Sequence, residues 1–124
     1  DRKKDIIVTT GGDNIAPQKI ENLFKTFDTE AEVVIFGDNK PFLIACVIIK
    51  HEKLTHAEAE NVIKKNDLYI KRLNKILSPI EKIRKHHYFF NKLDQKSGLL
   101  TPTMKIKRNK VYEKYKKEIE KLYN

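Results

Sequence analysis

The sequence predicts a single α+β domain over residues 1–124, with a small sheet, an N-terminal β-hairpin and three to four helices packed against the sheet. Two apolar, β-branched runs follow one another near the middle of the chain, separated by a short stretch of turn-forming residues. Segments with helical spacing of apolar residues occur before and after them. A chain of 124 residues, 40% of them hydrophobic, is long enough to bury a modest core.

The N-terminal region is expected to form a hairpin followed by a helix. Residues 5–10 are rich in β-forming side chains and end at Gly11 and Gly12, so residues 14–16 can return antiparallel to them. The proline that follows suits the first position of a helix. Apolar side chains at helical spacing then predict an amphipathic helix over 18–27 whose stripe faces a sheet: Ile20, Leu23, Phe24 and Phe27.

Three strands are expected to form that sheet. Residues 31–36 and 42–50 are the two apolar runs, and the composition of 37–41 between them favours a tight turn, which predicts a hairpin. The Tyr-Phe-Phe run at 88–90 predicts a third strand. The single cysteine, Cys46, lies within the second run, so it is expected to be a buried thiol in a reducing compartment and cannot form an internal disulfide.

Two helices are expected between the second and third strands. Thr55 and Glu58 match a capping box, in which each side chain bonds a free backbone amide of the other residue, and this predicts a helix over about 56–65. Asp67 can cap a second helix, which Pro79 should kink or break because proline lacks an amide donor. One face of that helix would carry the apolar residues Ile70, Leu73, Ile76, Leu77, Ile80 and Ile83.

The C-terminal region is expected to consist of a loop and a last helix. Residues 91–109 have weak periodicity but contain Gly98, Pro102 and paired cations, so they predict an exposed loop. Loops held by a rigid scaffold often carry chemistry. From about residue 110 to 123 apolar side chains alternate with lysines and glutamates at helical spacing, which predicts an amphipathic helix.

Net charge alone does not define a function for this chain. The formal charge of +9 comes from 26 basic and 17 acidic residues that are interleaved along most of the sequence. No helix-turn-helix, zinc or base-stacking motif accompanies them, so no specific nucleic acid is expected. Most of the basic residues are interpreted as a solvated face. A basic surface also suits a phosphate-bearing ligand or an anionic membrane. The four histidines lack metal-ligand spacing, and no metal site is expected.

Four motifs occur in a recognisable order. The chain opens with Asp-Arg-Lys-Lys-Asp and continues to Gly11-Gly12; Pro-x-x-Ile-Glu follows at 17–21, Gly-Asp-Asn-Lys-Pro-Phe at 37–42, and Thr-x-x-x-Lys-Ile-x-Arg at 101–108. Together they closely resemble the C-terminal domain of long-chain acyl-CoA synthetases, within the adenylate-forming superfamily. In the last motif, Thr103 and Met104 stand where the commoner Ser-Gly pair precedes the lysine. The long-chain branch carries this variation, which favours a fatty-acid ligase.

The resemblance implies roles for residues in the first and last motifs. Lys105 would be the catalytic lysine of adenylation, with Lys107 and Arg108 as weaker candidates for phosphate contacts. Such a reaction brings a carboxylate to the α-phosphate of ATP, and a long, mobile ammonium can stabilise the charge that develops. Most lysines in so basic a chain are simply solvated, and only the motif distinguishes Lys105 as a catalytic candidate.

The resemblance also implies roles for residues near the N-terminus, in the rotation of the domain and in the binding of CoA. Arg2 matches an arginine that contacts the ribose of the adenylate, and Lys4 occupies the hinge position about which the domain would turn between two poses. The alternative is that these residues form a solvated terminus. Gly11 and Gly12 would line the tunnel through which the pantetheine thiol reaches the acyl-adenylate, or would simply make a tight turn.

The implied reaction needs more protein than these residues supply. The family binds ATP, Mg2+ and the acyl chain mainly in a large N-terminal domain, so the chain is expected to be inactive alone and to have that domain, fatty acid, ATP and CoA as partners. No apolar run approaches the roughly 18 residues of a membrane span and no leader is present, which predicts a cytoplasmic protein. The alternatives are a ligase of another carboxylate and an independent nucleic-acid or membrane-binding module, with peripheral membrane contact open in each case.

Overall fold

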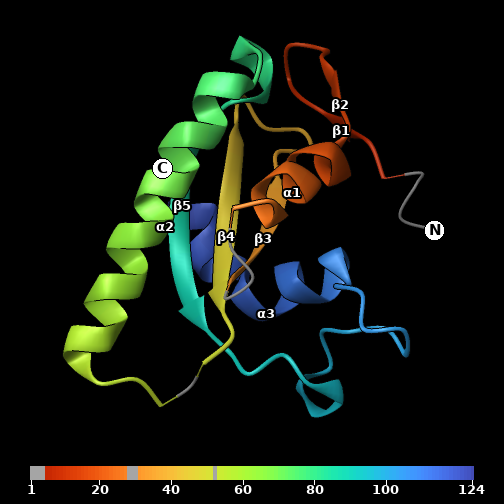
Figure 1. The fold of residues 1–124 in the computed structure, drawn as a ribbon. Coiled ribbons are helices and arrows are strands. Elements are labelled where there is room, and N and C mark those ends of the chain that lie inside the picture. The colour runs from red at the N-terminus through yellow and green to blue at the C-terminus, as the bar shows by residue number, and fades with distance from the viewer. Residues whose placement is uncertain (1–4, 28–30, 52) are drawn as a thin grey trace.

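A three-stranded sheet lies at the centre of the computed structural model, which describes residues 5–27, 31–51 and 53–124. The sheet contains β3 (Ala31–Phe36), β4 (Leu43–Ile49) and β5 (Ile83–Phe90), in the order β3-β4-β5. β3 and β4 pair antiparallel as the predicted hairpin, whereas β4 and β5 pair parallel. The parallel pairing requires a crossover, and the long helix between β4 and β5 provides it (Figure 1).

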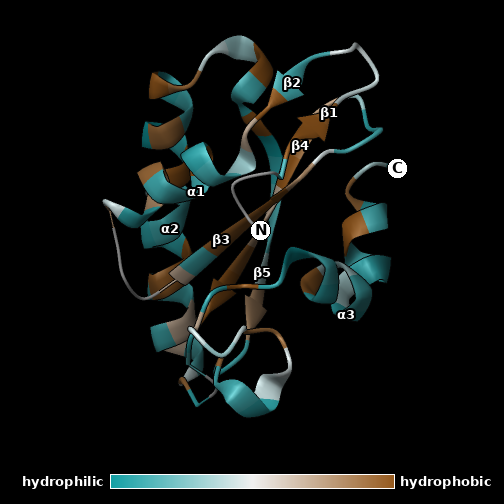
Figure 2. Cartoon of the chain, turned by 90° about the vertical axis from the view of Figure 1, so that its right-hand side faces the viewer, coloured by the Kyte–Doolittle hydropathy of each residue, from teal (hydrophilic) through white to brown (hydrophobic). Residues whose placement is uncertain are grey.

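The helices cover both faces of this sheet. α1 (Pro17–Lys25) and α2 (His56–Ile76) lie on one side, and α3 (Arg108–Lys121) lies on the other (Figure 2). Successive β4 side chains point to opposite faces, so Ala45 and Val47 join the cluster under α1 and α2 while Cys46 joins the cluster under α3. Every residue of β4 is buried, which explains its unbroken apolar run. The predicted α+β class is confirmed.

The predicted N-terminal hairpin is present and rests on the end of the sheet. β1 (Ile7–Val8) and β2 (Asn14–Ile15) pair antiparallel. The amide of Asn39 donates to the Val8 carbonyl at 2.9 Å, and the amide of Thr10 donates to the Lys40 carbonyl at 3.0 Å. The hairpin is therefore fixed to the turn between β3 and β4 by backbone hydrogen bonds.

The prediction of two helices between β4 and β5 is wrong. The capping box of Thr55 and Glu58 starts the helix as expected, but α2 runs without interruption to Ile76. Asp67 is not a cap: its carboxylate accepts hydrogen bonds from the Tyr88 hydroxyl and, at 2.9 Å, from the ring of His86. These β5 partners explain an acidic residue that sequence alone assigned to a helix start.

The end of α2 and the start of β5 also differ from the prediction. Pro79 lies beyond the helix and begins the short 3-10 helix η2 (Pro79–Glu81). Ile83 was expected on the helix face and instead opens β5, so the third strand begins five residues before Tyr88. Its first half is largely exposed and rich in cations, so it lacks the apolar pattern that predicts a strand.

The C-terminal elements follow the prediction closely. Residues 91–107 form a loop that contains the 3-10 helix η3 (Gln95–Ser97), and α3 begins at Arg108, two residues earlier than expected. Cys46 is buried, as predicted, and burial together with the nearby Glu118 raises the pKa of its thiol to about 12. Among the described residues, no helix is both long enough and apolar enough to cross a membrane.

Candidate functional site

Lys105 lies near the tip of a small hairpin-like loop. Leu100 and Ile106 pair as an antiparallel bridge. Beside them, the Lys107 amide donates to the Leu99 carbonyl at 2.8 Å, and the Thr101 amide donates to the Lys105 carbonyl at 2.7 Å. The lysine side chain is exposed at the end of this backbone scaffold. The structure thus confirms a loop that is exposed at residues 102–105, and it adds that this part of the loop is ordered by its own hydrogen bonds.

A left-handed residue shapes the turn before Lys105. Met104 has a φ of +66°. Its amide donates to the Thr101 carbonyl at 2.8 Å, and the Lys105 amide donates to the Thr101 hydroxyl at 3.0 Å. A positive φ favours glycine, because a Cβ atom crowds the backbone there. This geometry gives a physical reason for the glycine of the commoner motif.

Both flanks of the loop are tied to the core. Leu99, Leu100 and Ile106 are buried in the cluster beneath α3. At the start of α3, the Arg108 guanidinium binds both carboxylate oxygens of Glu21 in α1, one of them at 3.1 Å, and donates to the Ile35 carbonyl at 3.0 Å. The loop therefore projects an exposed lysine from two anchored ends.

The Arg108 contacts bear on its predicted role. The Glu21 carboxylate is almost fully buried and also accepts a hydrogen bond from the Ile35 amide at 2.9 Å. Asp5 adds a second, longer ion pair to the Arg108 Nε atom at 3.6 Å. These partners give Arg108 a structural role as the clamp between α1, β3 and α3. A contact with a phosphate stays an untested prediction.

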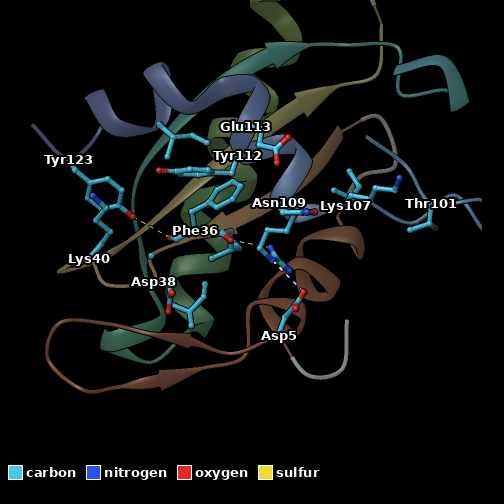
Figure 3. Close-up of a pocket in the computed structure, with 16 residues that line it drawn as sticks. Asp5, Phe36, Asp38, Lys40, Thr101, Lys107, Asn109, Tyr112, Glu113 and Tyr123 are labelled. Atoms are coloured by element: carbon cyan, nitrogen blue, oxygen red, sulfur yellow. Dashed lines mark hydrogen bonds and ion pairs between the residues drawn. The ribbon is translucent and has the colours of Figure 1, made fainter. Parts of the chain in front are cut away.

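A cavity of about 670 Å3 lies beside the Lys105 loop, between the N-terminal hairpin and α3. Figure 3 shows Tyr123 and Lys40 at one end and Thr101 and Lys107 at the other. Its wall includes Phe36 and other apolar side chains. Lys107, the second candidate cation of the motif, belongs to the same loop as Lys105 and is half-buried at the rim of the cavity.

A polar cluster closes the far end of this cavity. The Lys40 ammonium lies 3.0 Å from Glu120 and 5.0 Å from the centre of the Tyr123 ring. The Tyr112 hydroxyl donates to the other Glu120 oxygen at 2.6 Å. These hydrogen bonds, from Tyr112 and then from Lys40, lower the pKa of Glu120. Sequence reasoning did not find this cluster, because Lys40 and Glu120 are 80 positions apart.

The two glycines of the N-terminal turn are not equivalent. Gly12 has a φ of +85°, and its amide donates to the Thr9 carbonyl at 2.9 Å. Gly11 has no such positive φ, and a Cβ atom added there would meet only the Asp13 and Thr9 side chains, at 3.7 Å and 3.9 Å. The turn therefore requires glycine at 12 but not at 11. Gly11 is exposed and available for close approach.

Two cations missed by sequence reasoning lie near this turn. A small hollow of about 170 Å3 is lined by Thr9, Asp13, Lys82 and Arg84, together with residues of the neighbouring turns. Lys82 falls within the segment expected to be helical and Arg84 directly follows it, so sequence reasoning did not place them beside the hairpin. In the structure they stand at the base of the turn that carries Gly11 and Gly12.

The two candidate loops lie far apart. The Gly11-Gly12 turn is at one end of the molecule, and the segment that carries Lys105 is at the opposite end, below α3, in both orientations (Figures 1 and 2). The remaining predicted residues, Arg2 and Lys4, lie outside the described residues. The site is thus two separated surfaces rather than one cleft.

Comparison with known proteins agrees with the motifs and the fold. A model of the AMP-binding enzyme C-terminal domain matches residues 4–124. The chain is 34% identical over 139 residues to long-chain-fatty-acid CoA ligase FadD15 of Mycobacterium tuberculosis, covering 99% of this chain and 23% of the ligase. It is 33% identical to human long-chain-fatty-acid CoA ligase 6, covering 100% of this chain and 20% of the ligase.

A solved structure supports the same fold. The adenylation domain of a carboxylate reductase from Mycobacterium chelonae superposes with a TM-score of 0.77 at 22% identity, over 99% of this chain and 20% of that one. At this identity the likeness shows the fold alone. The chain belongs to the AMP-binding enzyme C-terminal domain family. It spans about a fifth of the length of the curated long-chain-fatty-acid CoA ligases it matches.

Proposed function

We propose that this chain is the mobile C-terminal domain of a long-chain-fatty-acid CoA ligase. The reaction has two steps, adenylation of a fatty acid by ATP and transfer of the acyl group to the CoA thiol. The observation that carries the proposal is the wide separation of the Lys105 loop from the Gly11-Gly12 turn (Figure 1). One small domain can bring both to a single acyl-adenylate only by turning between the steps, and Lys4 is the proposed pivot.

Lys105 is proposed to act in the first step. Its ammonium stands on an anchored loop at the protein surface, and it forms no ion pair with another described residue. An unpaired lysine on a rigid base can enter a site on another domain and stabilise the charge that develops on the phosphate. Lys107 is proposed as a secondary phosphate contact, and Arg2 as a contact to the ribose.

ATP and Mg2+ are proposed to bind mainly outside this chain. Within the residues that the structure describes, no group of three or more His, Cys, Asp or Glu side chains could hold a metal ion. Mg2+ prefers carboxylate and phosphate oxygens, and it would supply charge neutralisation on the phosphates of ATP. The large domain and the nucleotide would provide these ligands.

The Gly11-Gly12 turn is proposed to act in the second step. Without a side chain, Gly11 lets the pantetheine arm pass close to the backbone. Lys82 and Arg84, at the small hollow beside the turn, are suited to contact the phosphates of CoA. Asp13 lines the same hollow, and its carboxylate would repel a phosphate. Lys82 and Arg84 would therefore bind the CoA phosphates on the side away from that carboxylate.

A ligase of another carboxylate is the second candidate. The acid would be bound by the remainder of the protein, so nothing in this domain selects its length. Long-chain acids are favoured because the curated relatives carry that activity in their names and because Thr103-Met104 matches the variant of the long-chain branch.

The test separates the two half-reactions in the full-length protein. Lys105→Ala should reduce fatty-acid-dependent pyrophosphate release on the order of a hundredfold, the effect of losing a preorganised charge-stabilising group. Thioester formation from supplied acyl-adenylate should be largely kept. Lys92→Ala, an exposed lysine in the same segment, is the matched control and should retain both steps. Equal loss of both steps in Lys105→Ala, or robust turnover by the 124 residues alone, would contradict the proposal.

A further inference from the structure

The outward face of α2 carries a dense group of cations. With 3.6 residues per helical turn, positions 64, 68, 71 and 75 share one side, and positions 65, 72 and 76 lie beside them. The basic members of this face are all exposed: Lys64, Lys65, Lys71, Arg72 and Lys75. The opposite side of the helix packs on the sheet through Ile70 and Leu73.

Two large apolar side chains are exposed among these cations. Leu68 is 57% exposed and lies in the middle of the basic group, and Ile76 is 62% exposed at its end. They contribute nothing to the core that α2 covers. Single exposed apolar residues are ordinary, but two on a strip that is otherwise almost wholly basic form a distinct kind of surface.

The charge on this face is not neutralised. Asp67 is the only acid between residues 61 and 76, and its carboxylate is bound to Tyr88 and His86. None of the five cations forms an ion pair with another described residue. Elsewhere the cations of this domain are often paired, as Lys40 is with Glu120. Lys71 lies close enough to Asp67 to help lower the pKa of that carboxyl, so the face keeps a net positive charge but not five isolated ones.

We propose that this face, defined by the five cations with Leu68 and Ile76, docks on the surface of an anionic membrane. Lysine and arginine side chains near a bilayer are attracted by acidic headgroups, and the exposed leucine and isoleucine can enter the apolar layer beneath them. A nucleic acid would satisfy the charges but offers no apolar layer for Leu68 and Ile76, and the face has no exposed aromatic ring for base stacking. This inference does not depend on the proposed function.

The test measures binding of the 124-residue chain to vesicles by flotation. Vesicles of phosphatidylcholine alone are compared with vesicles that also contain phosphatidylglycerol, at about 0.15 M salt. Binding should require the anionic lipid. Lys71→Glu/Arg72→Glu should weaken it on the order of tenfold or more, and Leu68→Ser/Ile76→Ser should weaken it severalfold at unchanged charge.

Two controls make the outcome decisive. Lys116→Glu/Lys117→Glu makes the same change of charge at exposed positions of α3 and should have a much smaller effect than the α2 variant. Circular dichroism and thermal unfolding check that each variant is folded. All the substituted positions are exposed, so the fold should tolerate the changes. Equal losses for the α2 and α3 variants, no effect of Leu68→Ser/Ile76→Ser, or complete displacement from the vesicles by duplex DNA at equal phosphate concentration would each overturn the proposal.

Discussion

The guanidinium of Arg108, in the first turn of α3, forms a bidentate ion pair with the buried carboxylate of Glu21 in α1. The two residues are 87 positions apart in the sequence. Arg108 directly follows the loop that carries Lys105, and it also binds the Ile35 carbonyl in β3. One side chain therefore links both faces of the sheet to the base of the candidate catalytic loop.

Removing either partner of this pair should destabilise the domain strongly. Glu21→Gln or Arg108→Met leaves one charge without its partner in a poorly hydrated place, so the free energy of unfolding should fall by about 3 kcal/mol. Glu21→Gln/Arg108→Met, which removes both charges, should lose less than the two single changes added together. Urea unfolding of the 124-residue chain measures all three. Additive losses would show that the pair is not coupled.

The same variants separate the two roles considered for Arg108. If it is only a clamp, Arg108→Met in the full-length protein should reduce adenylation in proportion to the loss of folded protein. If it also contacts a phosphate, the KM for ATP should rise even at temperatures where the variant is fully folded. Glu21→Gln is the control because it breaks the clamp without removing the arginine.

Met104→Gly should relieve strain in the turn before Lys105. The left-handed conformation costs a residue with a Cβ atom about 1–2 kcal/mol, and glycine avoids this cost but gains freedom in the unfolded chain. We expect a net rise of up to about 1 kcal/mol in the free energy of unfolding. Met104→Ala is the matched control, since it trims the side chain and keeps the strain. Urea unfolding should therefore rank Gly above Ala, and the reverse order would contradict the strain.

The glycine turn predicts different outcomes at its two positions. Gly11→Leu should leave thermal stability nearly unchanged, because its φ is not positive and a Cβ atom has room, yet it should slow thioester formation in the full-length protein by about tenfold or more. Gly12→Ala should instead lower the free energy of unfolding by about 1–2 kcal/mol, because φ is +85°.

Adenylation by Gly11→Leu should remain close to that of the parent protein, the reverse of the Lys105→Ala pattern. Gly11→Ala serves as the small-side-chain control. A stable Gly11→Leu variant with unaltered thioester formation would remove this turn from the mechanism.

Sequence patterns were sufficient where one local rule decided the structure. The Thr55 and Glu58 capping box marked the start of α2, and the β-branched runs with the turn at 37–41 predicted the hairpin of β3 and β4. The exposed loop with Lys105 also followed from local composition. These features depend on neighbouring residues, so they could be predicted without any tertiary contact.

Tertiary contacts decided the rest. Asp67 looked like a helix cap because its side chain suits that position, but Tyr88 and His86 from β5 hold it within α2. The first half of β5 lacks an apolar pattern, and it is held as a strand by pairing with the buried β4. Arg84 lies in that same strand and Lys82 directly precedes it, and this places both beside the Gly11-Gly12 turn. Local sequence carries no signal for such pairings.

The Asp67 and Tyr88 pair predicts a dependence of stability on pH. Partial burial alone would raise the pKa of Asp67, but hydrogen bonds from Tyr88 and His86 outweigh it and lower that pKa below its ordinary value of 3.8. A lowered pKa in the folded state stabilises the fold above the ordinary value, and this contribution is lost as the pH falls through the folded pKa. Burial, followed by the nearby Asp67, raises the pKa of Tyr88, so the phenol stays neutral in this range.

Tyr88→Phe should therefore lower the free energy of unfolding near pH 7 by about 1 kcal/mol, a value reduced for the partial exposure of Asp67. The pKa of Asp67, followed by NMR, should rise, and the difference in stability from the parent chain should narrow as the pH falls below about 4. Tyr69→Phe is the control, because Tyr69 lies on the same helix as Asp67 and its ring packs on Phe27. It should leave the pH profile unchanged. A Tyr88→Phe profile parallel to that of the parent chain down to pH values well below 4 would show that the Asp67 carboxylate does not depend on this hydroxyl.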